Sequence, residues 1–220
     1  RYDFFNHTTS LFEEAFFKQI HNTVNEQGIS FCGHLMLEDE LLGQLNWGGD
    51  IMRLYPNFDI PGIDMLFDYI EFITAKQTQS VVRQYNKEAM LSELFGVTGW
   101  DYDFKALKVQ GDWQAAMGVS VRVPHLSMYS MKGAAKRDYP QSFNYQVPWY
   151  KEMKFLEDHY ARLNTVLSRG TDLVNVAIVH PFETVMLIGQ STSYPLSISE
   201  RRLFDIIFFI SEAEGRRCRV

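Results

Sequence analysis

Predicted helices and strands alternate along this chain, and the connections that leave the strands are much longer than those that lead into them. Short apolar runs at 29–32, 89–93, 119–123 and 174–179 each predict a buried strand. Regular alternation of this kind is typical of an α/β fold whose strands form a parallel sheet. The order of elements therefore restricts the chain to a small group of architectures.

The helices are predicted from apolar spacing and from residues that start or stop helices. Ser10 and Glu13 form a capping-box pattern for a first helix, which Gly28 ends. A second helix is predicted over 63–73, with further helical turns to Asn86, and a short one over 112–116 with Asp112 as its cap. Pro148 starts a longer helix that ends before Gly170, and Ser197 with Glu200 repeats the capping box near the end of the chain.

The long connections at 33–61, 94–110 and 124–147 carry Trp47, Trp100, His34 and His125 together with several Asp and Glu residues. A TIM barrel places its active site on the loops at the carboxyl ends of its strands. A doubly wound sheet does the same, so the asymmetry alone leaves both architectures open. No GxGxxG motif follows the first strand, which weakens a dinucleotide-binding interpretation.

Two carboxyl groups are the candidate catalytic residues. Glu93 stands at the end of a predicted strand, where barrel enzymes commonly place catalytic side chains. Glycoside hydrolysis needs two such groups flanking the scissile bond, and Glu38, which follows the first strand, is the natural partner. The structural alternatives are that Glu93 pairs with an Arg or caps a helix, and that Glu38 only begins a helix.

The same connections carry the candidate sugar-binding residues His34, Trp47, Trp100, Asp101 and His125. Sugar rings stack their apolar faces on aromatic side chains, while polar groups bind the hydroxyls. Trp100 and Asp101 follow Glu93 closely and suit these two tasks. A purely structural role is the alternative for each His and Trp, and we favour it for Trp113.

A catalytic metal or other cofactor is not predicted. His34 and Glu38 would share one helix face at a spacing of i and i+4, but the HExxH motif is absent. Turn and cap roles explain Asp50, Asp59 and Asp64. Acids in such a loop also suit Ca²⁺, so a structural calcium site stays open.

The composition of the chain argues against several classes of binding partner. The net charge is −6 and no Lys/Arg-rich run occurs, so we expect no nucleic-acid surface. The apolar stretches are far shorter than the roughly 18 residues that a membrane span needs.

Cys32 and Cys218 lie in unlike contexts, which argues against a disulfide framework. The chain begins with Arg1, so we expect an internal start and predict neither a localisation nor an oligomeric state.

Several long motifs resemble the large bacterial and fungal glycoside hydrolases related to α-L-rhamnosidases. The resemblance covers about residues 1 to 187 and is carried by FCGHLMLEDELLGQ, GGDIMRLYPNFDIPGID, EAMLSELFGVTGWDYDF, GDWQAAMGVSVRVPHLS and VPWYKEMKFLEDHYARLNTVLSRG. It implies the C-terminal part of a (β/α)8 TIM barrel over 1–170, with Glu93 as a barrel carboxylate and Glu38 as a candidate second one. It also implies the start of a following α/β domain over 171–220, with a divergent C-terminus.

The expected function is hydrolysis of α-linked deoxysugars such as rhamnose in plant or microbial polysaccharides. Glu93 would act as base or nucleophile and Glu38 as acid. One alternative is a fragment that binds glycans weakly without catalysis, because a half barrel has open sheet edges. The other is a metal-dependent sugar isomerase on a similar barrel.

Overall fold

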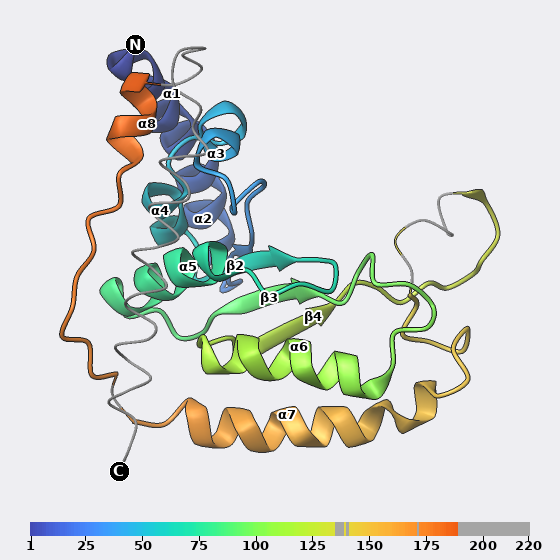
Figure 1. Ribbon diagram of the computed structural model, residues 1–220. Helices are drawn as coiled ribbons and strands as arrows, with labels where there is room; N and C mark the ends of the chain where they lie inside the picture. Colours follow the sequence, from blue (N-terminus) through green and yellow to red (C-terminus); the bar gives the residue numbers. More distant parts are fainter. Residues whose placement is uncertain (135–138, 140, 171, 189–220) are drawn as a thin grey trace.

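The computed structural model describes residues 1–134, 139, 141–170 and 172–188, which form a mixed α/β fold around a curled parallel sheet (Figure 1). Four strands in these ranges follow the order of the sequence: β1 (Cys32–Gly33), β2 (Ile60–Met65), β3 (Leu91–Leu94) and β4 (Val121–Pro124). Each neighbouring pair is parallel. Consecutive parallel strands in a curled sheet also occur in one half of a (β/α)8 barrel, so a partial barrel is compatible with this architecture.

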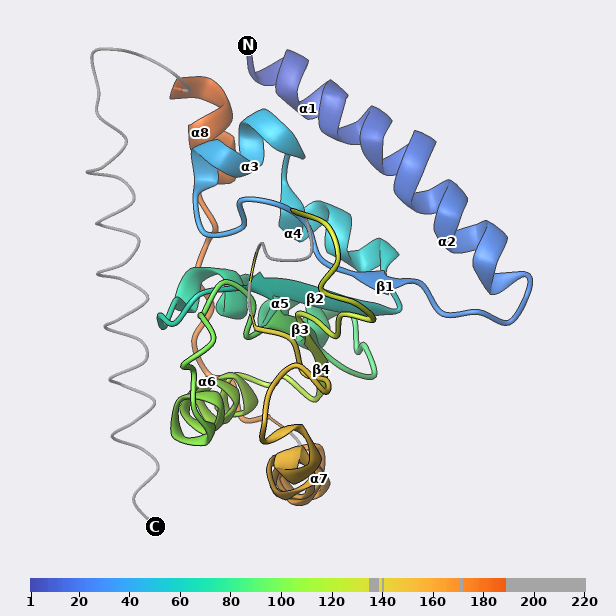
Figure 2. The same cartoon turned by 90° about the vertical axis from the view of Figure 1, so that its right-hand side faces the viewer.

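Helices precede, connect and follow the strands. A long N-terminal helix consists of α1 (Tyr2–Phe12), a π-helical turn η1 (Glu13–Phe17) and α2 (Lys18–Asn25), and it runs along the β1 side of the molecule (Figure 2). The connections between strands contain α3 (Leu41–Trp47), α4 (Ile51–Leu54), the 3-10 turn η2 (Tyr55–Asn57), α5 (Phe72–Gln84) and α6 (Phe104–Ala116). After β4 come the 3-10 turn η4 (Tyr150–Glu152), α7 (Met153–Leu167) and α8 (Phe182–Ile188). No helix in the described ranges is long and apolar enough to cross a membrane.

The core lies where the helices pack on the sheet. One cluster joins β2 to α5 and to the approach to β4 through Ile63, Met65, Ala75, Met90 and Val119. A second joins β3 to α6 and α7, with Leu94, Leu107 and Tyr160 among its members. Each fully buried Leu or Ile contributes roughly 1.5–3 kcal/mol relative to exposure. The sheet is thus held from its helical side, and Phe95 and Tyr102 of the connection after β3 also belong to this core.

The predictions for β3, β4 and the helix after Pro148 are confirmed within a few residues. The predicted first strand at 29–32 is wrong in position and burial, because β1 begins at Cys32 and Ile29 is 58% exposed.

The predicted helix over 63–73 is wrong, because residues 60–65 form β2 and α5 begins only at Phe72, but the further helical turns predicted up to Asn86 are confirmed by α5. Ile63 and Met65 are both fully buried in the strand, whereas Ile70 is exposed. The helical spacing of these apolar residues is therefore coincidental. The real start of α5 is Glu71, whose carboxylate accepts hydrogen bonds from the backbone N–H groups of Ile73 and Thr74.

Two predicted caps are also wrong. The first helix begins at Tyr2, and the Ser10 hydroxyl inside it donates to the Asn6 carbonyl. The helix before β4 begins eight residues earlier than Asp112, at Phe104, and Asp103 caps it by accepting from the Ala106 N–H.

The predicted strand at 174–179 is wrong as well, because these residues form no strand and their side chains are exposed. They lead to α8, which packs against α1 and α3. The second capping box at Ser197 and Glu200 lies outside the described residues, and the domain predicted over 171–220 stays a prediction.

Candidate functional site

Two acidic side chains stand side by side at the carboxyl ends of neighbouring strands. Asp64 of β2 and Glu93 of β3 are register partners. Partners in adjacent parallel strands project from the same face of a sheet. Both side chains are partly exposed, in contrast to their buried neighbours Ile63, Met65 and Leu94. The sheet therefore presents a pair of carboxyl groups at the edge where α/β folds place their sites.

His34 directly follows β1 and contacts one member of this pair, Glu93. Its Nε2 lies 2.6 Å from Oε2 of Glu93, and its Nδ1 lies 2.7 Å from the carbonyl oxygen of Leu35. A carbonyl only accepts, so Nδ1 carries a proton. A carboxylate also only accepts, so a second proton lies between Nε2 and Glu93. The pair is either an imidazolium with a carboxylate or an imidazole with a carboxylic acid.

The surroundings favour the imidazolium. Burial lowers the pKa of the His34 ring, but the hydrogen bond to Leu35 and the charge of Glu38 raise it. The hydrogen bond to Glu93 and the charge of Asp64 raise it further, and the net effect is a raised pKa. His34 thus holds a positive charge against the carboxyl group of Glu93.

The carboxyl group of Asp64, in contrast, lies in surroundings that favour its uncharged, protonated form. Burial raises the pKa of its carboxyl group; the charge of His34 acts against this, and the charge of Glu93 adds to it. The net shift is upward. Two neighbouring carboxyl groups whose environments push their pKa values apart are the usual basis for dividing the roles of acid and base.

His125 closes the site on the β4 side. Its Nε2 lies 3.8 Å from Oε1 of Glu93. Its Nδ1 is buried and has no hydrogen-bond partner among the described residues. The ring lies against Gly96, where a Cβ atom would stand 2.7 Å from Nδ1 of His125 and 2.7 Å from Cδ2 of Leu66. Gly96 is therefore needed to let the ring approach Glu93.

Glu38 occupies the interior beneath these residues, at 3% exposure. Its Oε1 accepts from the Leu35 N–H at 2.9 Å and from the Tyr55 hydroxyl, and its Oε2 accepts from the Asp64 N–H at 2.9 Å. Burial raises the pKa of Glu38 to about 7, against the hydrogen bonds that lower it. The carboxylate joins the loop after β1 to β2 and so positions His34 and Asp64. Its predicted role as catalytic acid is untested, but its oxygen atoms face protein groups.

Backbone conformations around the site are strained. Phe67 after β2 has φ 67°, and Phe95 and Val97 after β3 have φ 76° and φ 60°. Left-handed conformations cost non-glycine residues about 1–3 kcal/mol each and cluster at functional sites. A β-branched residue such as Val97 is rare there. The backbone that leaves β2 and β3 is thus held in shapes that its own residues do not favour.

The other predicted sugar-binding residues lie farther out. Trp100 and Asp101 are exposed in the connection from β3 to α6. Trp47 ends α3 and is 68% exposed. Trp113 packs into the core beside Phe72, as we expected from the sequence. His34 and His125 are therefore the two members of the predicted set that the structure brings to Glu93.

No described group of three or more His, Cys, Asp or Glu side chains is arranged to hold a metal ion. The segment from His34 to Glu38 forms no helix, so these two side chains do not share a helix face at a spacing of i and i+4. Asp50 caps α4 by accepting from the Arg53 N–H, and Asp59 accepts from Asn25 and from the Phe31 N–H. Asp50 therefore has the cap role that its sequence context indicates, whereas Asp59 joins α2 and the residue before β1 rather than forming a turn or a cap.

Sequence reasoning missed Asp64 and Gly96 as site residues. Asp64 was assigned a turn or cap role because β2 was not predicted. The signal that was present is the alternation of Ile63, Asp64 and Met65 after Gly62. Gly96 follows a strand that was predicted, but its importance depends on a tertiary contact.

Comparison with protein-family models, with curated proteins and with solved structures returns no match. The relation to rhamnosidase-like hydrolases therefore stays a prediction.

Proposed function

We propose that this chain carries the active-site part of a TIM-barrel glycoside hydrolase of the α-L-rhamnosidase-like type, with Glu93 and Asp64 as its two carboxyl groups. The observation that carries the proposal is their register on adjacent parallel strands, with His34 on Glu93. Glycoside hydrolysis needs one protonated and one ionised carboxyl group flanking the scissile bond. The charge of His34 suits an ionised Glu93, and the raised pKa of Asp64 suits the acid.

In this mechanism Glu93 attacks the anomeric carbon or activates a water, and Asp64 protonates the departing glycosidic oxygen. Adjacent strands lie about 4.8 Å apart. This spacing is closer to the roughly 5–5.5 Å of retaining enzymes than to the roughly 6.5–9.5 Å of inverting ones. We therefore expect Glu93 to be a nucleophile and the product to keep the anomeric configuration of the substrate.

The test compares hydrolysis of aryl and methyl α-L-rhamnosides by the wild type and by site variants. Glu93→Gln should lower kcat about 10²–10⁴-fold for every substrate. Asp64→Asn should do so for methyl rhamnoside but much less for dinitrophenyl rhamnoside, because a good leaving group needs little acid assistance. With Glu93→Ala, added azide should restore turnover and give a glycosyl azide.

Asp158→Asn is the matched control, because Asp158 pairs with Lys154 on the exposed side of α7, away from the site. Its kinetics should equal those of the wild type. Near-normal hydrolysis by a folded Glu93→Gln protein, or no hydrolysis of any glycoside by the wild type, would contradict the proposal.

Glu38→Gln separates the positioning role of Glu38 from the role of acid. Its amide N–H₂ would face the N–H or O–H donors that the carboxylate now accepts from. We expect a loss of about 1–3 kcal/mol in the free energy of unfolding. Glu40→Gln, at an exposed neighbour, is the control. If Glu38→Gln leaves stability unchanged and removes turnover of methyl rhamnoside alone, Glu38 is the acid.

A further inference from the structure

An aromatic groove of about 360 Å³ opens next to the candidate site. Phe12, Phe16 and Phe17 form one wall, and Phe31 and Phe58 form part of the other. Trp47 stands at the end of α3 and also lines the groove. The N-terminal helix that supplies the first wall lies beside β1 and α3 in Figure 2. The volume falls within the range of roughly 300–1,000 Å³ that small-molecule sites occupy.

The groove offers flat apolar surfaces and few hydrogen-bonding groups. Phe31 and Phe58 stack with their ring centroids 4.5 Å apart at an angle of 11°. Phe12 is 37% exposed and Phe16 is 46% exposed, so parts of both rings face outward. A sugar ring needs partners for its hydroxyls, because an unpaired polar group loses free energy when it is buried. The lining therefore suits an apolar ring system better than a sugar.

His34 belongs to both the groove and the candidate site. It lines the groove, while its Nε2 contacts Glu93. A molecule whose polar end reaches Glu93 and Asp64 can thus extend past His34 into the aromatic groove. His34 is the residue that the groove shares with the candidate site, and Glu93 and Asp64 lie on its far side from the groove lining.

We infer that this groove binds the apolar, aromatic aglycone of a small glycoside, while the sugar lies at Glu93 and Asp64. This inference rests on the proposed function and adds the substrate class to it. Aromatic side chains that stack on such a group strengthen its binding beyond what the buried area alone contributes. The preferred substrates are accordingly small aryl glycosides rather than long polysaccharides.

The test uses the folded Glu93→Gln protein, which binds substrate without turning it over. Titration calorimetry compares 2-naphthyl α-L-rhamnoside, methyl α-L-rhamnoside and 2-naphthol. The naphthyl glycoside should bind at least about ten-fold more tightly than the methyl glycoside. Trp47→Ala and Phe16→Ala should remove most of this preference. Phe155→Ala is the control, because Phe155 is an equally exposed aromatic residue on α7, outside the groove.

Cys32 gives a second readout that does not depend on hydrolysis. It is exposed and lines the groove, and a Cys218→Ser background leaves it as the single thiol of the chain. At ten times the Kd of 2-naphthol, alkylation of Cys32 by iodoacetamide should slow about ten-fold. 2-Naphthol should protect Cys32 to the same extent when position 93 carries the wild-type Glu.

The outcomes separate the two proposals. If the naphthyl and methyl glycosides bind equally, or 2-naphthol leaves Cys32 unprotected, the aglycone site is wrong even where methyl rhamnoside is hydrolysed. If 2-naphthol protects Cys32 but no glycoside is cleaved, the groove is an apolar binding site and the hydrolase proposal fails. Preference for the naphthyl glycoside together with its hydrolysis supports both.

Discussion

At the scale of single residues, the site depends on the proton that His34 and Glu93 share. The Leu35 carbonyl fixes the proton on Nδ1, which leaves Nε2 to share a second proton with the carboxylate. The ring therefore acts as a fixed positive charge beside Glu93, and its own titration should be visible in stability.

We expect this pair to stabilise the fold at neutral and lower pH and to lose its effect in alkali. The folded pKa of His34 is raised above its ordinary value near 6.5, so the contribution is complete below about pH 6.5. It should disappear as the pH rises through the higher folded value. Urea unfolding between pH 6 and 9 should show the difference between wild type and His34→Asn shrinking as the pH rises.

His7→Asn, at an exposed position of α1, is the control for the loss of an imidazole outside the site. A difference for His34→Asn that does not change with pH would show that folding does not raise the pKa of the ring, and one that grows with pH would show that the ring is neutral in the folded protein. The direct measurement is an NMR titration of the His34 ring, whose midpoint we expect above 6.5.

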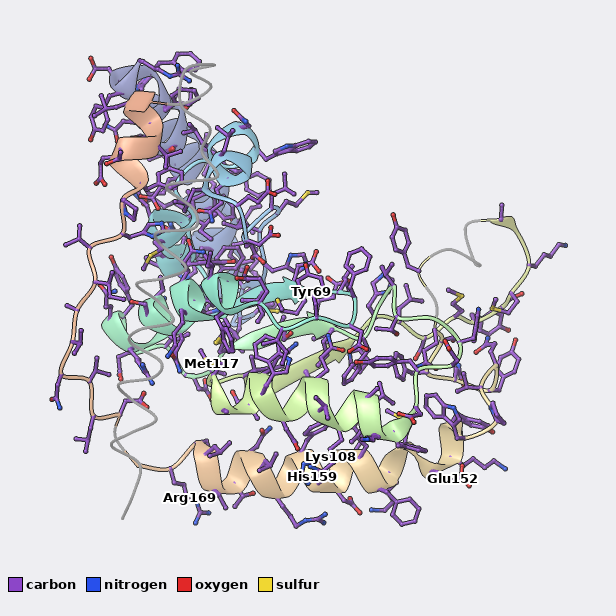
Figure 3. All side chains as sticks on the ribbon, in the orientation of Figure 1. Tyr69, Lys108, Met117, Glu152, His159 and Arg169 are labelled. Atoms are coloured by element: carbon purple, nitrogen blue, oxygen red, sulfur yellow. The ribbon has the colours of Figure 1, made fainter. Side chains whose placement is uncertain are left out.

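At the scale of elements, the contact between α6 and α7 shows how the sheet is supported from outside. The Tyr160 hydroxyl of α7 donates to the Leu107 carbonyl of α6 at 2.7 Å, and the Arg122 guanidinium lies 4.2 Å from the Tyr160 ring centre. Farther along the contact, Nε2 of His159 lies 2.6 Å from Oδ1 of Asp112, which also pairs with Lys108. Figure 3 labels Lys108 and His159 where the two helices face each other.

Gly111→Ala should destabilise this contact although it improves helix propensity. A Cβ atom at Gly111 would lie 2.6 Å from Cε1 of Tyr160, and the ring is held at its hydroxyl and on its face. Overpacking costs about 1–3 kcal/mol, against a gain of about 1 kcal/mol in propensity. We expect a net loss near 1 kcal/mol in urea unfolding.

The double variant Gly111→Ala/Tyr160→Ala tests this explanation. With the ring removed, the alanine should become neutral or stabilising relative to Tyr160→Ala alone. If its cost persists in the absence of the ring, the clash with Tyr160 is not its cause.

Short apolar runs in the sequence located β3 and β4, misplaced β1, predicted a strand at 174–179 that does not form, and missed β2. β3 and β4 follow from such runs, and with them the positions of Glu93 and His125. In β2 the apolar pattern is interrupted by Pro61, Gly62 and Asp64. The pairing of Asp64 with Glu93 and the network of Glu38 depend on strand register, which no local pattern contains.

At the scale of the whole molecule, the last described helix, α8, packs against the first, α1. Nε of Arg83, at the end of α5, donates to Asp172 at 2.8 Å, and the chain then runs across the molecule to α8 (Figure 1). There Phe182, Val185 and Met186 pack with Leu41 and Leu45 of α3, and Tyr2 and Phe5 of α1 contact the same cluster. Since α1 continues into η1, α8 also supports the helix that forms one wall of the aromatic groove.

Phe182→Ala should therefore weaken both the fold and the groove. Phe182 is 1% exposed, and removing a buried Phe side chain costs about 3–5 kcal/mol. Phe155→Ala, which removes a side chain that is 76% exposed, should change stability by less than about 0.5 kcal/mol. Urea unfolding measures both, and iodoacetamide labelling of Cys32 in the Cys218→Ser background reports on the groove. With Phe182→Ala, but not with Phe155→Ala, 2-naphthol should protect Cys32 less against labelling, because a loosened α1 no longer holds the wall of the groove in place. A large loss of stability with unchanged protection would mean that α8 stabilises the N-terminal helices without shaping the groove.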